Sequence, residues 1–213
     1  MKQEWRKTEK GLYLPKARPE IVDVPDFRFL QIQGEGHPGS SRFAECITAL
    51  FSLSYALKMS LKKRESPPED YTDYTVYPLE GVWDLNEQGR AEYGQGTLNK
   101  DHFVYTLMIR QPSFISDEYF SEIRTGVLKK KPQPLQDQVE LVDYREGKCI
   151  QMLHTGSFDS EPASFARMEA YAEEQNLQRL SRTHREIYLS DFRKTEEAKL
   201  KTVLRFRVDY TAG

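Results

Sequence analysis

The sequence is poor in the residues that form disulfides and metal sites. It has two cysteines among 213 residues, Cys46 and Cys149, and they form no pair motif, so we expect two free thiols in a reducing compartment. Its four histidines have no cysteine or carboxylate at the spacing of metal ligands. We therefore expect neither a metal site nor a cofactor.

Long apolar runs and a basic excess are also missing. No segment approaches the roughly 18 apolar residues of a membrane span, and residues 1–10 are charged, unlike a signal peptide. We expect a cytoplasmic protein with no membrane partner. The 31 basic residues nearly balance 33 acidic residues, whereas proteins that bind the phosphate backbone usually carry a basic excess. Direct nucleic-acid binding is therefore not expected.

Local signatures of several enzyme classes are absent or unconvincing. There is no Gly-x-Ser-x-Gly elbow and no Cys-His signature, so classical covalent hydrolysis has no support from the sequence. Residues 34–39 match Gly-x-Gly-x-x-Gly, but Glu35 would face the pyrophosphate and Pro38 removes an N–H donor. We interpret this stretch as a glycine-rich turn between a strand and a helix.

The residues that are abundant indicate a globular chain with a well-solvated exterior. Hydrophobic residues make up 38% and charged residues 30% of the sequence. The 12 tyrosines, 11 phenylalanines and 2 tryptophans supply enough flat apolar surface to exclude a disordered chain. The length suits one large domain or two small ones with a proper core.

The hydrophobic pattern predicts alternating strands and helices after a polar arm that lies on the surface at residues 1–18. Ser40 or Ser41 can cap the first helix, and Pro162 suits the first turn of the last one. We interpret residues 86–96 as a turn, and Glu146-Gly147 as the tip of a hairpin. The predicted strands are 20–24, 27–33, 71–83, 102–110, 139–144, 148–155, 182–189 and 202–208, and the predicted helices are 41–60, 116–131 and 162–176.

The order strand, helix, strand, strand occurs twice, which indicates an internal duplication. We predict an α+β fold in which two such units pair about a pseudo-twofold axis. Antiparallel sheets would carry helices on one side and leave a ligand cleft at the seam. The predicted organisation is an arm at 1–18 and a single domain at 19–213, made of a first repeat at about 19–112, a connecting helix and linker at 113–137, and a second repeat at about 138–213.

The segment around Glu186 holds the most informative acidic residue. In a strand, His184, Glu186 and Tyr188 share one face, and Ile187 lies on the other. If helices cover the Ile187 face, Glu186 faces the groove. A carboxylate in the middle of a strand is unusual, because it is expensive to bury unpaired. The alternative is a structural ion pair with an arginine of the adjacent strand, such as Arg205 or Arg207.

Tyrosines and a tryptophan gather in the predicted central strands. Aromatic residues in strands usually pack in a core, but buried tyrosine hydroxyls need a partner or water. A wet, aromatic cleft with one acid would suit a flat aromatic guest that is cationic or polar. The candidates for its walls are Tyr71, Tyr74, Tyr77, Trp83, Tyr105 and Met108.

Several stretches together resemble the GyrI-like family. The closing segment at 184–191 (His-Arg-Glu-Ile-Tyr-Leu-Ser-Asp) and residues 199–205 resemble the end of these proteins, and residues 13–15, 73–81 and 106–112 resemble the stand-alone members. The resemblance covers nearly the whole chain. Phe192, where the family usually has proline, and Arg207 depart from it, and neither is the proposed acid.

The resemblance implies a fold similar to the drug-binding domain of multidrug-sensing transcription activators, in which a buried glutamate corresponding to Glu186 meets cationic aromatic drugs. Some stand-alone members resemble enzymes that hydrolyse the cyclopropane of cyclopropanoid DNA-alkylating antibiotics, which detoxifies the drug and gives antibiotic resistance. We therefore expect a cofactor-independent hydrolase. The expected catalytic residues are Glu186, Tyr71 and His184, and the expected ligand-binding residues are Trp83, Tyr74, Tyr105, Met108, Tyr188 and His154.

Two alternatives stay open at this point. The protein could bind or sequester drugs without turnover, because the same cleft would serve both roles. It could also inhibit a topoisomerase by protein contact, as the family name implies. The sequence fixes neither the natural substrate nor the oligomeric state.

Overall fold

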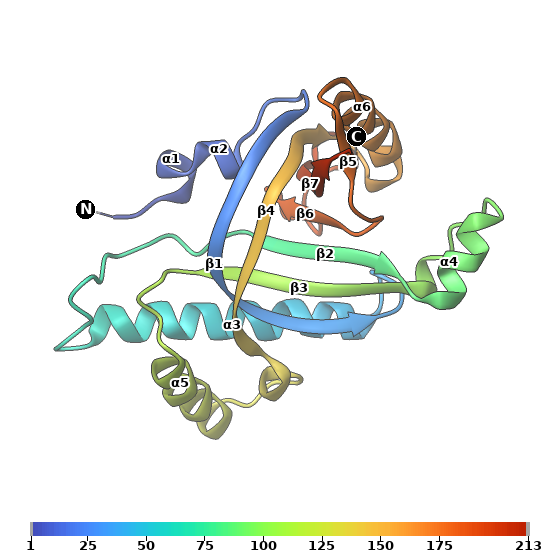
Figure 1. Ribbon diagram of the computed structural model, residues 1–213. Coiled ribbons are helices and arrows are strands. Elements are labelled where there is room, and N and C mark those ends of the chain that lie inside the picture. Colours follow the sequence, from blue (N-terminus) through green and yellow to red (C-terminus); the bar gives the residue numbers. More distant parts are fainter. Residues whose placement is uncertain (1, 212–213) are drawn as a thin grey trace. The chain divides into compact units, whose positions relative to one another are not determined.

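The computed structural model describes residues 2–211 as two compact units. The first contains residues 2–4, 27–79 and 83–144, and the second contains residues 5–26, 80–82 and 145–211. After α1 begins at Trp5, the chain passes between the units inside strands rather than in loops (Figure 1). These strands are β1 (Glu20–Glu35), β2 (Leu79–Leu85) and β4 (Glu140–Thr155).

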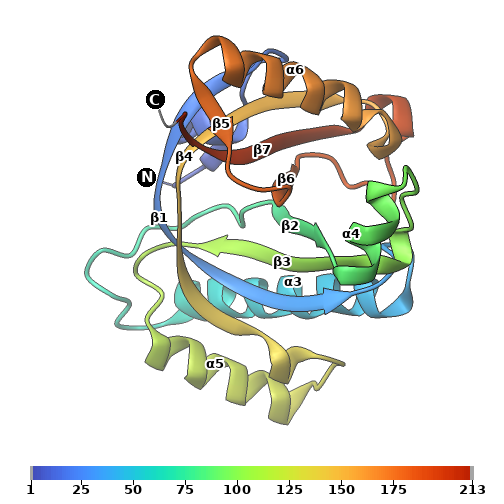
Figure 2. The same ribbon diagram turned by 45° about the vertical axis from the view of Figure 1, so that its right-hand side comes forward.

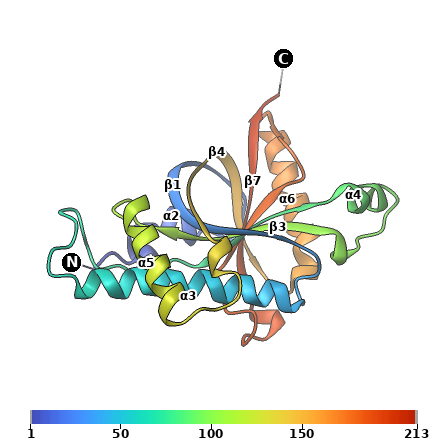
Figure 3. The same ribbon diagram turned by 90° about the horizontal axis from the view of Figure 1, so that it is seen from below.

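In the first unit, two antiparallel strands carry a long helix. β1 pairs with β3 (Phe103–Gln111), with Arg28 opposite Gln111. Helix α3 (Ser41–Lys63) packs on β3, and α5 (Asp117–Lys130) packs on α3 (Figure 3). Each helix begins where a serine hydroxyl accepts an N–H of the first turn, Ser40 for α3 and Ser116 for α5. A short helix α4 (Glu87–Gly94) follows β2.

In the second unit, β7 (Lys201–Tyr210) is the common partner of three strands. It pairs antiparallel with β4, with β6 (His184–Tyr188) and with the short β5 (Leu177–Arg179). Helix α6 (Glu161–Glu174) lies across this sheet (Figure 2). The core between them contains Ile150, Met152, Met168, Ala172, Leu177, Leu204, Phe206 and Val208.

The α+β class, the antiparallel pairing and the helices packed alongside the strands are confirmed. The first series runs β1, α3, β2, β3 and the second runs β4, α6, β6, β7, with shorter elements inserted. The repeated order strand, helix, strand, strand is therefore present as expected. None of the helices within residues 2–211 is long and apolar enough to cross a membrane.

Two predicted breaks are wrong, because the strands continue through them. β1 runs without interruption past Pro25, and β4 runs through the predicted hairpin tip at Glu146-Gly147. Gly147 has a φ of 74°, a conformation that glycine adopts without a Cβ penalty and that suits an irregularity within a strand. Glu146 is consequently buried in the strand instead of exposed at a turn.

Three other segments also differ from the expectation. The strand predicted at 71–83 begins only at Leu79, and the turn predicted at 86–96 contains helix α4, which Asn86 caps. The predicted arm is wrong for residues 2–18, the part of it that the structure describes. They contain α1 (Trp5–Thr8) and α2 (Lys10–Tyr13), and the side chains of Trp5 and Tyr13 are buried. These two aromatic rings, 5.4 Å apart, anchor a segment whose other residues are mostly polar.

A close approach at Gly34 generates a test of the packing of β1 against β3. Gly34 lies opposite Tyr105, and a Cβ at position 34 would lie 2.5 Å from a ring carbon of Tyr105. We expect Gly34→Ala to lower the free energy of unfolding by about 1–3 kcal/mol, because the packed ring must move. Gly126→Ala in α5 is the matched control, since its Cβ meets nothing within 4 Å. Equal stability of both variants in denaturant unfolding would contradict this packing.

Candidate functional site

Glu186 lies in the middle of β6 and is buried, with 8% of its surface exposed. It stands opposite Leu204 of β7, a member of the core that α6 covers. Residues opposite each other on paired strands share a face, so Glu186 lies on the face toward α6. The condition under which Glu186 would face a groove, helices on the Ile187 face alone, is therefore not met, because α6 covers the face that carries Glu186.

The helix brings a second carboxyl group to Glu186. Glu161 is the first residue of α6 and is 5% exposed. It lies beside Glu186, because Phe158 before it and Phe165 one turn after it contact Tyr188 and His184, which flank Glu186 on the same face of β6. Burial, and then the negative charge of Glu186, raise the pKa of Glu161 to about 10. Glu161 is therefore protonated at neutral pH and can donate to the carboxylate of Glu186.

His184 completes the surroundings of this carboxylate. Its Nε2 lies 3.2 Å from Oε1 of Glu186, and its Nδ1 lies 3.4 Å from the carbonyl oxygen of Arg182. The edge of its ring meets Phe165 of α6, with ring centroids 4.8 Å apart. With a proton on Nε2, His184 donates to Glu186, so that two side chains can donate to one buried carboxylate.

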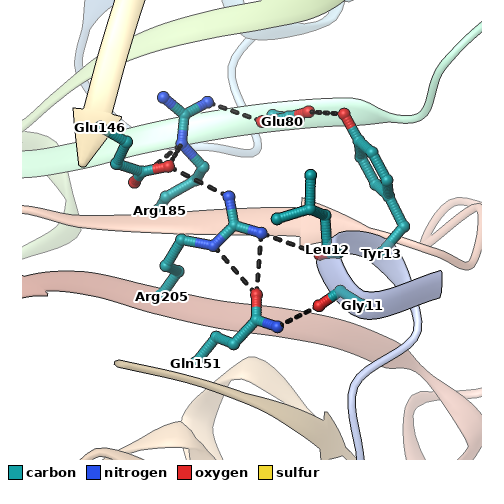
Figure 4. Close-up of polar contacts among 8 residues, drawn as sticks. All are labelled: Gly11, Leu12, Tyr13, Glu80, Glu146, Gln151, Arg185 and Arg205. Atoms are coloured by element: carbon teal, nitrogen blue, oxygen red, sulfur yellow. Dashed lines mark hydrogen bonds and ion pairs between the residues drawn. The ribbon is translucent and has the colours of Figure 1, made fainter. Parts of the chain in front are cut away.

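The opposite face of β6 holds a buried ion network (Figure 4). Arg185 and Arg205 stand opposite each other on β6 and β7, and Glu146 of β4 binds both. The distances are 3.1 Å from Arg185 Nε to Glu146 Oε1 and 3.0 Å from Arg205 Nη1 to Glu146 Oε2. Arg185 Nη1 also lies 2.6 Å from Oε2 of Glu80. The structural ion pair considered for Glu186 is thus made by Glu146 instead, at Arg205.

The charges of this network decide the ionisation of Glu146. Burial alone would raise its pKa, but the two guanidinium groups of Arg185 and Arg205 outweigh burial and hold the pKa of Glu146 below its usual range. Glu146 is therefore ionised, whereas Glu161, equally buried, is neutral. The difference follows from the sign of the neighbouring charge.

The N-terminal segment is part of the same network (Figure 4). Arg205 donates to the carbonyl oxygen of Leu12 at 2.8 Å, and Gln151 donates to that of Gly11 at 2.6 Å. The hydroxyl of Tyr13 donates to Glu80 at 3.3 Å. These bonds explain why residues 5–14 fold against the sheet.

Two further expected ligand-binding residues lie in the second unit. His154 of β4 is buried, with Nδ1 2.9 Å from the hydroxyl of Ser164 and Nε2 3.1 Å from the carbonyl oxygen of Ser157. Both ring nitrogens are thus engaged by the protein itself. The ring of Tyr188 packs at 5.5 Å from Phe192, the residue that departs from the family pattern.

The remaining expected site residues belong to the first unit and form two aromatic groups there. Trp83 and Tyr105 lie 5.4 Å apart, and Phe43 contacts both. Tyr71 and Tyr74 each pack edge-on against Phe114. Met108 is buried in β3. Within the part of the chain that the structure describes, three buried hydroxyls have no hydrogen-bond partner: those of Tyr71, Tyr74 and Tyr105.

Sequence reasoning missed Glu161 and Glu146. An acid at the start of a helix is ordinary, because it complements the helix dipole, and therefore it gave no signal. Glu146 precedes a glycine, which is typical of a turn. No group of three or more histidine, cysteine, aspartate or glutamate side chains among residues 2–211 is arranged to hold a metal ion.

Comparisons with known proteins identify the family. The model of the GyrI-like small molecule binding domain matches residues 17–209, so the chain belongs to this family. Two crystal structures described as hydrolases from Listeria innocua are 34% and 36% identical, with TM-scores of 0.86 and 0.87. The alignments cover 97% and 98% of this chain, and they cover the whole of each Listeria chain.

A more distant solved structure shares the fold alone. The C-terminal domain of EcmrR is 10% identical, with a TM-score of 0.52, and the alignment covers 91% of this chain and 98% of that domain. A comparison with curated protein sequences found no match. The chain is thus a GyrI-like small-molecule-binding domain, and its similar relatives include proteins described as hydrolases.

The ion network predicts a large cost for losing Glu146. Glu146→Gln leaves two buried guanidinium groups without their shared carboxylate, so we expect the free energy of unfolding to fall by about 3–5 kcal/mol. Glu196→Gln, which breaks an exposed pair with Lys199, is the control and should change little. Denaturant unfolding measures both, and a Glu146→Gln protein as stable as the control would contradict the role of the network.

The proton on Glu161 predicts a pH-dependent stability. The folded protein holds it up to about pH 10, whereas the unfolded chain loses it near the ordinary value of 4.5. Between these limits, unfolding releases a proton. The stabilisation is therefore complete at low pH and is lost as the pH rises. The free energy of unfolding falls by up to about 1.4 kcal/mol per pH unit. Glu161→Gln removes this contribution. Denaturant unfolding at several pH values should show a shallower decline for the variant, and identical slopes would contradict the assignment.

Proposed function

We propose that this protein binds flat aromatic small molecules and hydrolyses the cyclopropane of cyclopropanoid DNA-alkylating antibiotics, which detoxifies them. The observation that carries the proposal is Glu186, a buried carboxyl group 3.2 Å from His184 and beside Glu161, with no lysine or arginine paired to it among the described residues. The relatives described as hydrolases support hydrolytic chemistry. The family itself supports a small-molecule ligand.

The proposed reaction is the addition of one water molecule. Glu186 takes a proton from water, and the water oxygen bonds to the unsubstituted cyclopropane carbon. The bond between that carbon and the spiro carbon breaks, and its electron pair moves into the dienone ring, which becomes a phenolate. The phenolate oxygen then takes a proton. No electron acceptor or cofactor is needed, because nothing is oxidised. A positioned general base contributes about 10²–10⁴-fold to such a step.

The other site residues have proposed roles of two kinds. Tyr71 or His184 would donate a hydrogen bond to the developing phenolate oxygen. Tyr71 is suited to this because its hydroxyl has no partner in the described chain. The aromatic and sulfur-containing side chains would hold the flat ligand by stacking and apolar contact, and these are Trp83, Tyr74, Tyr105, Met108 and Tyr188. His154, whose ring nitrogens are both engaged, would support the fold near the site.

The test is the consumption of a spirocyclopropyl dienone, followed by mass spectrometry. Native protein should convert many equivalents to the water adduct, and Glu186→Gln should lower kcat about 100-fold or more, because the amide cannot take a proton. Glu173→Gln, an exposed position on α6, is the matched control and should retain native activity. Tight binding without consumption would favour a sequestering protein. Equal rates for native protein and Glu186→Gln would exclude Glu186 as the base.

A further inference from the structure

The carboxyl group of Glu161 is buried in a way that the fold alone does not explain. Glu161 is 5% exposed, and its Oε1 has no hydrogen-bond partner among residues 2–211. Buried polar atoms without a partner destabilise a protein. An alanine or leucine at the start of α6 would avoid that cost. The side chain is therefore better explained by its position beside Glu186 than by the stability of the helix.

The charged and titratable groups around Glu161 are few. β6 contributes Glu186, with His184 bonded to it, and the 3₁₀ turn at Phe158–Ser160 contributes Asp159. β4 contributes His154, whose ring is engaged by Ser164 and the carbonyl of Ser157. No lysine or arginine of the described chain forms an ion pair with Glu161 or Glu186. The N-terminus of α6 carries a positive partial charge that favours ionised Glu161, and burial beside another carboxyl group opposes it.

We infer that Glu161 is a positioning residue for Glu186: its carboxyl group keeps its proton and donates a hydrogen bond to the side chain of Glu186, which holds that side chain in one orientation. The catalytic consequence rests on the function proposed above, whereas the shared proton does not. Donation to the charged form of a buried carboxylate stabilises that form. The second donor, His184, reaches Oε1 of Glu186 from the same strand.

This arrangement requires a hydrogen-bond donor at position 161, and the donor does not need to be charged. Glutamine has the shape of glutamate and carries a permanent N–H donor, so Glu161→Gln should preserve the bond to Glu186. Leucine fills similar space without a donor, so Glu161→Leu should leave Glu186 with His184 as its remaining donor. If Glu161 acted as a second negative charge instead, both variants would lose function equally.

The first experiment needs no substrate. Protein labelled at the side-chain carboxyl carbon of glutamate is titrated by NMR, and the signal of Glu161 is assigned by its loss in Glu161→Gln. We expect the chemical shift of a protonated carboxyl group at neutral pH, with titration only in the alkaline range. A Glu161 signal that is already that of a carboxylate at neutral pH would overturn the inference, whether or not the protein is an enzyme.

The second experiment compares hydrolysis of the spirocyclopropyl dienone by native protein, Glu161→Gln and Glu161→Leu. We expect kcat within about threefold of native for glutamine and at least about tenfold lower for leucine. The native rate should fall at alkaline pH as the shared proton is lost, and the rate of Glu161→Gln should not. Equal loss in both variants, or the same alkaline decline in Glu161→Gln, would overturn the positioning role. If native protein shows no hydrolysis, the proposed function fails and the NMR titration still decides the shared proton.

Discussion

The bridge of Glu146 to two arginines is the interaction on which the second unit depends. Arg185 and Arg205 are directly opposite each other on paired strands, buried and of like charge, an arrangement that is unfavourable unless an anion lies between them. Glu146 supplies that anion from β4. Because β4, β6 and β7 each contribute one member, the bridge fixes the three strands to one another. Arg185 is also the sequence neighbour of Glu186, so the same bridge fixes the backbone that carries the proposed base.

The two faces of β6 satisfy buried carboxyl groups in different ways. On one face, the positive guanidinium groups balance the negative charge of Glu146, which stays ionised. On the other, Glu161 has a carboxylate as its neighbour and keeps its proton. The first arrangement is suited to a rigid scaffold, because every partner is charged and geometrically fixed. The second leaves one carboxylate, Glu186, with hydrogen-bond donors and without a counter-ion, which is the state that a general base or the counter-charge of a cationic ligand requires.

The sequence predicted the features that depend on neighbouring residues, and it was misleading about the features that depend on residues far apart in the chain. A serine cap and an apolar stripe predicted the start of α3, the helix predicted at 116–131 matches α5 to within one residue at each end, and strand alternation placed Glu186 on the same face as His184. Glu146-Gly147 has the chemistry of a turn, but β4 continues through it toward its pairing with β7, which begins at Cys149. The contact between Glu161 and Glu186 joins residues far apart in the chain, and no local pattern marks it. For the same reason, the sequence did not show that α6 covers the face of β6 that carries Glu186.

The central proposal is that this GyrI-like domain adds water to its ligand. The most direct measurement is the product mass after reaction of a spirocyclopropyl dienone in water enriched in heavy oxygen. The account predicts a product that carries one heavy oxygen atom and forms in many equivalents over protein. A product without the label, or a labelled product that forms at the same rate without the protein, would contradict it.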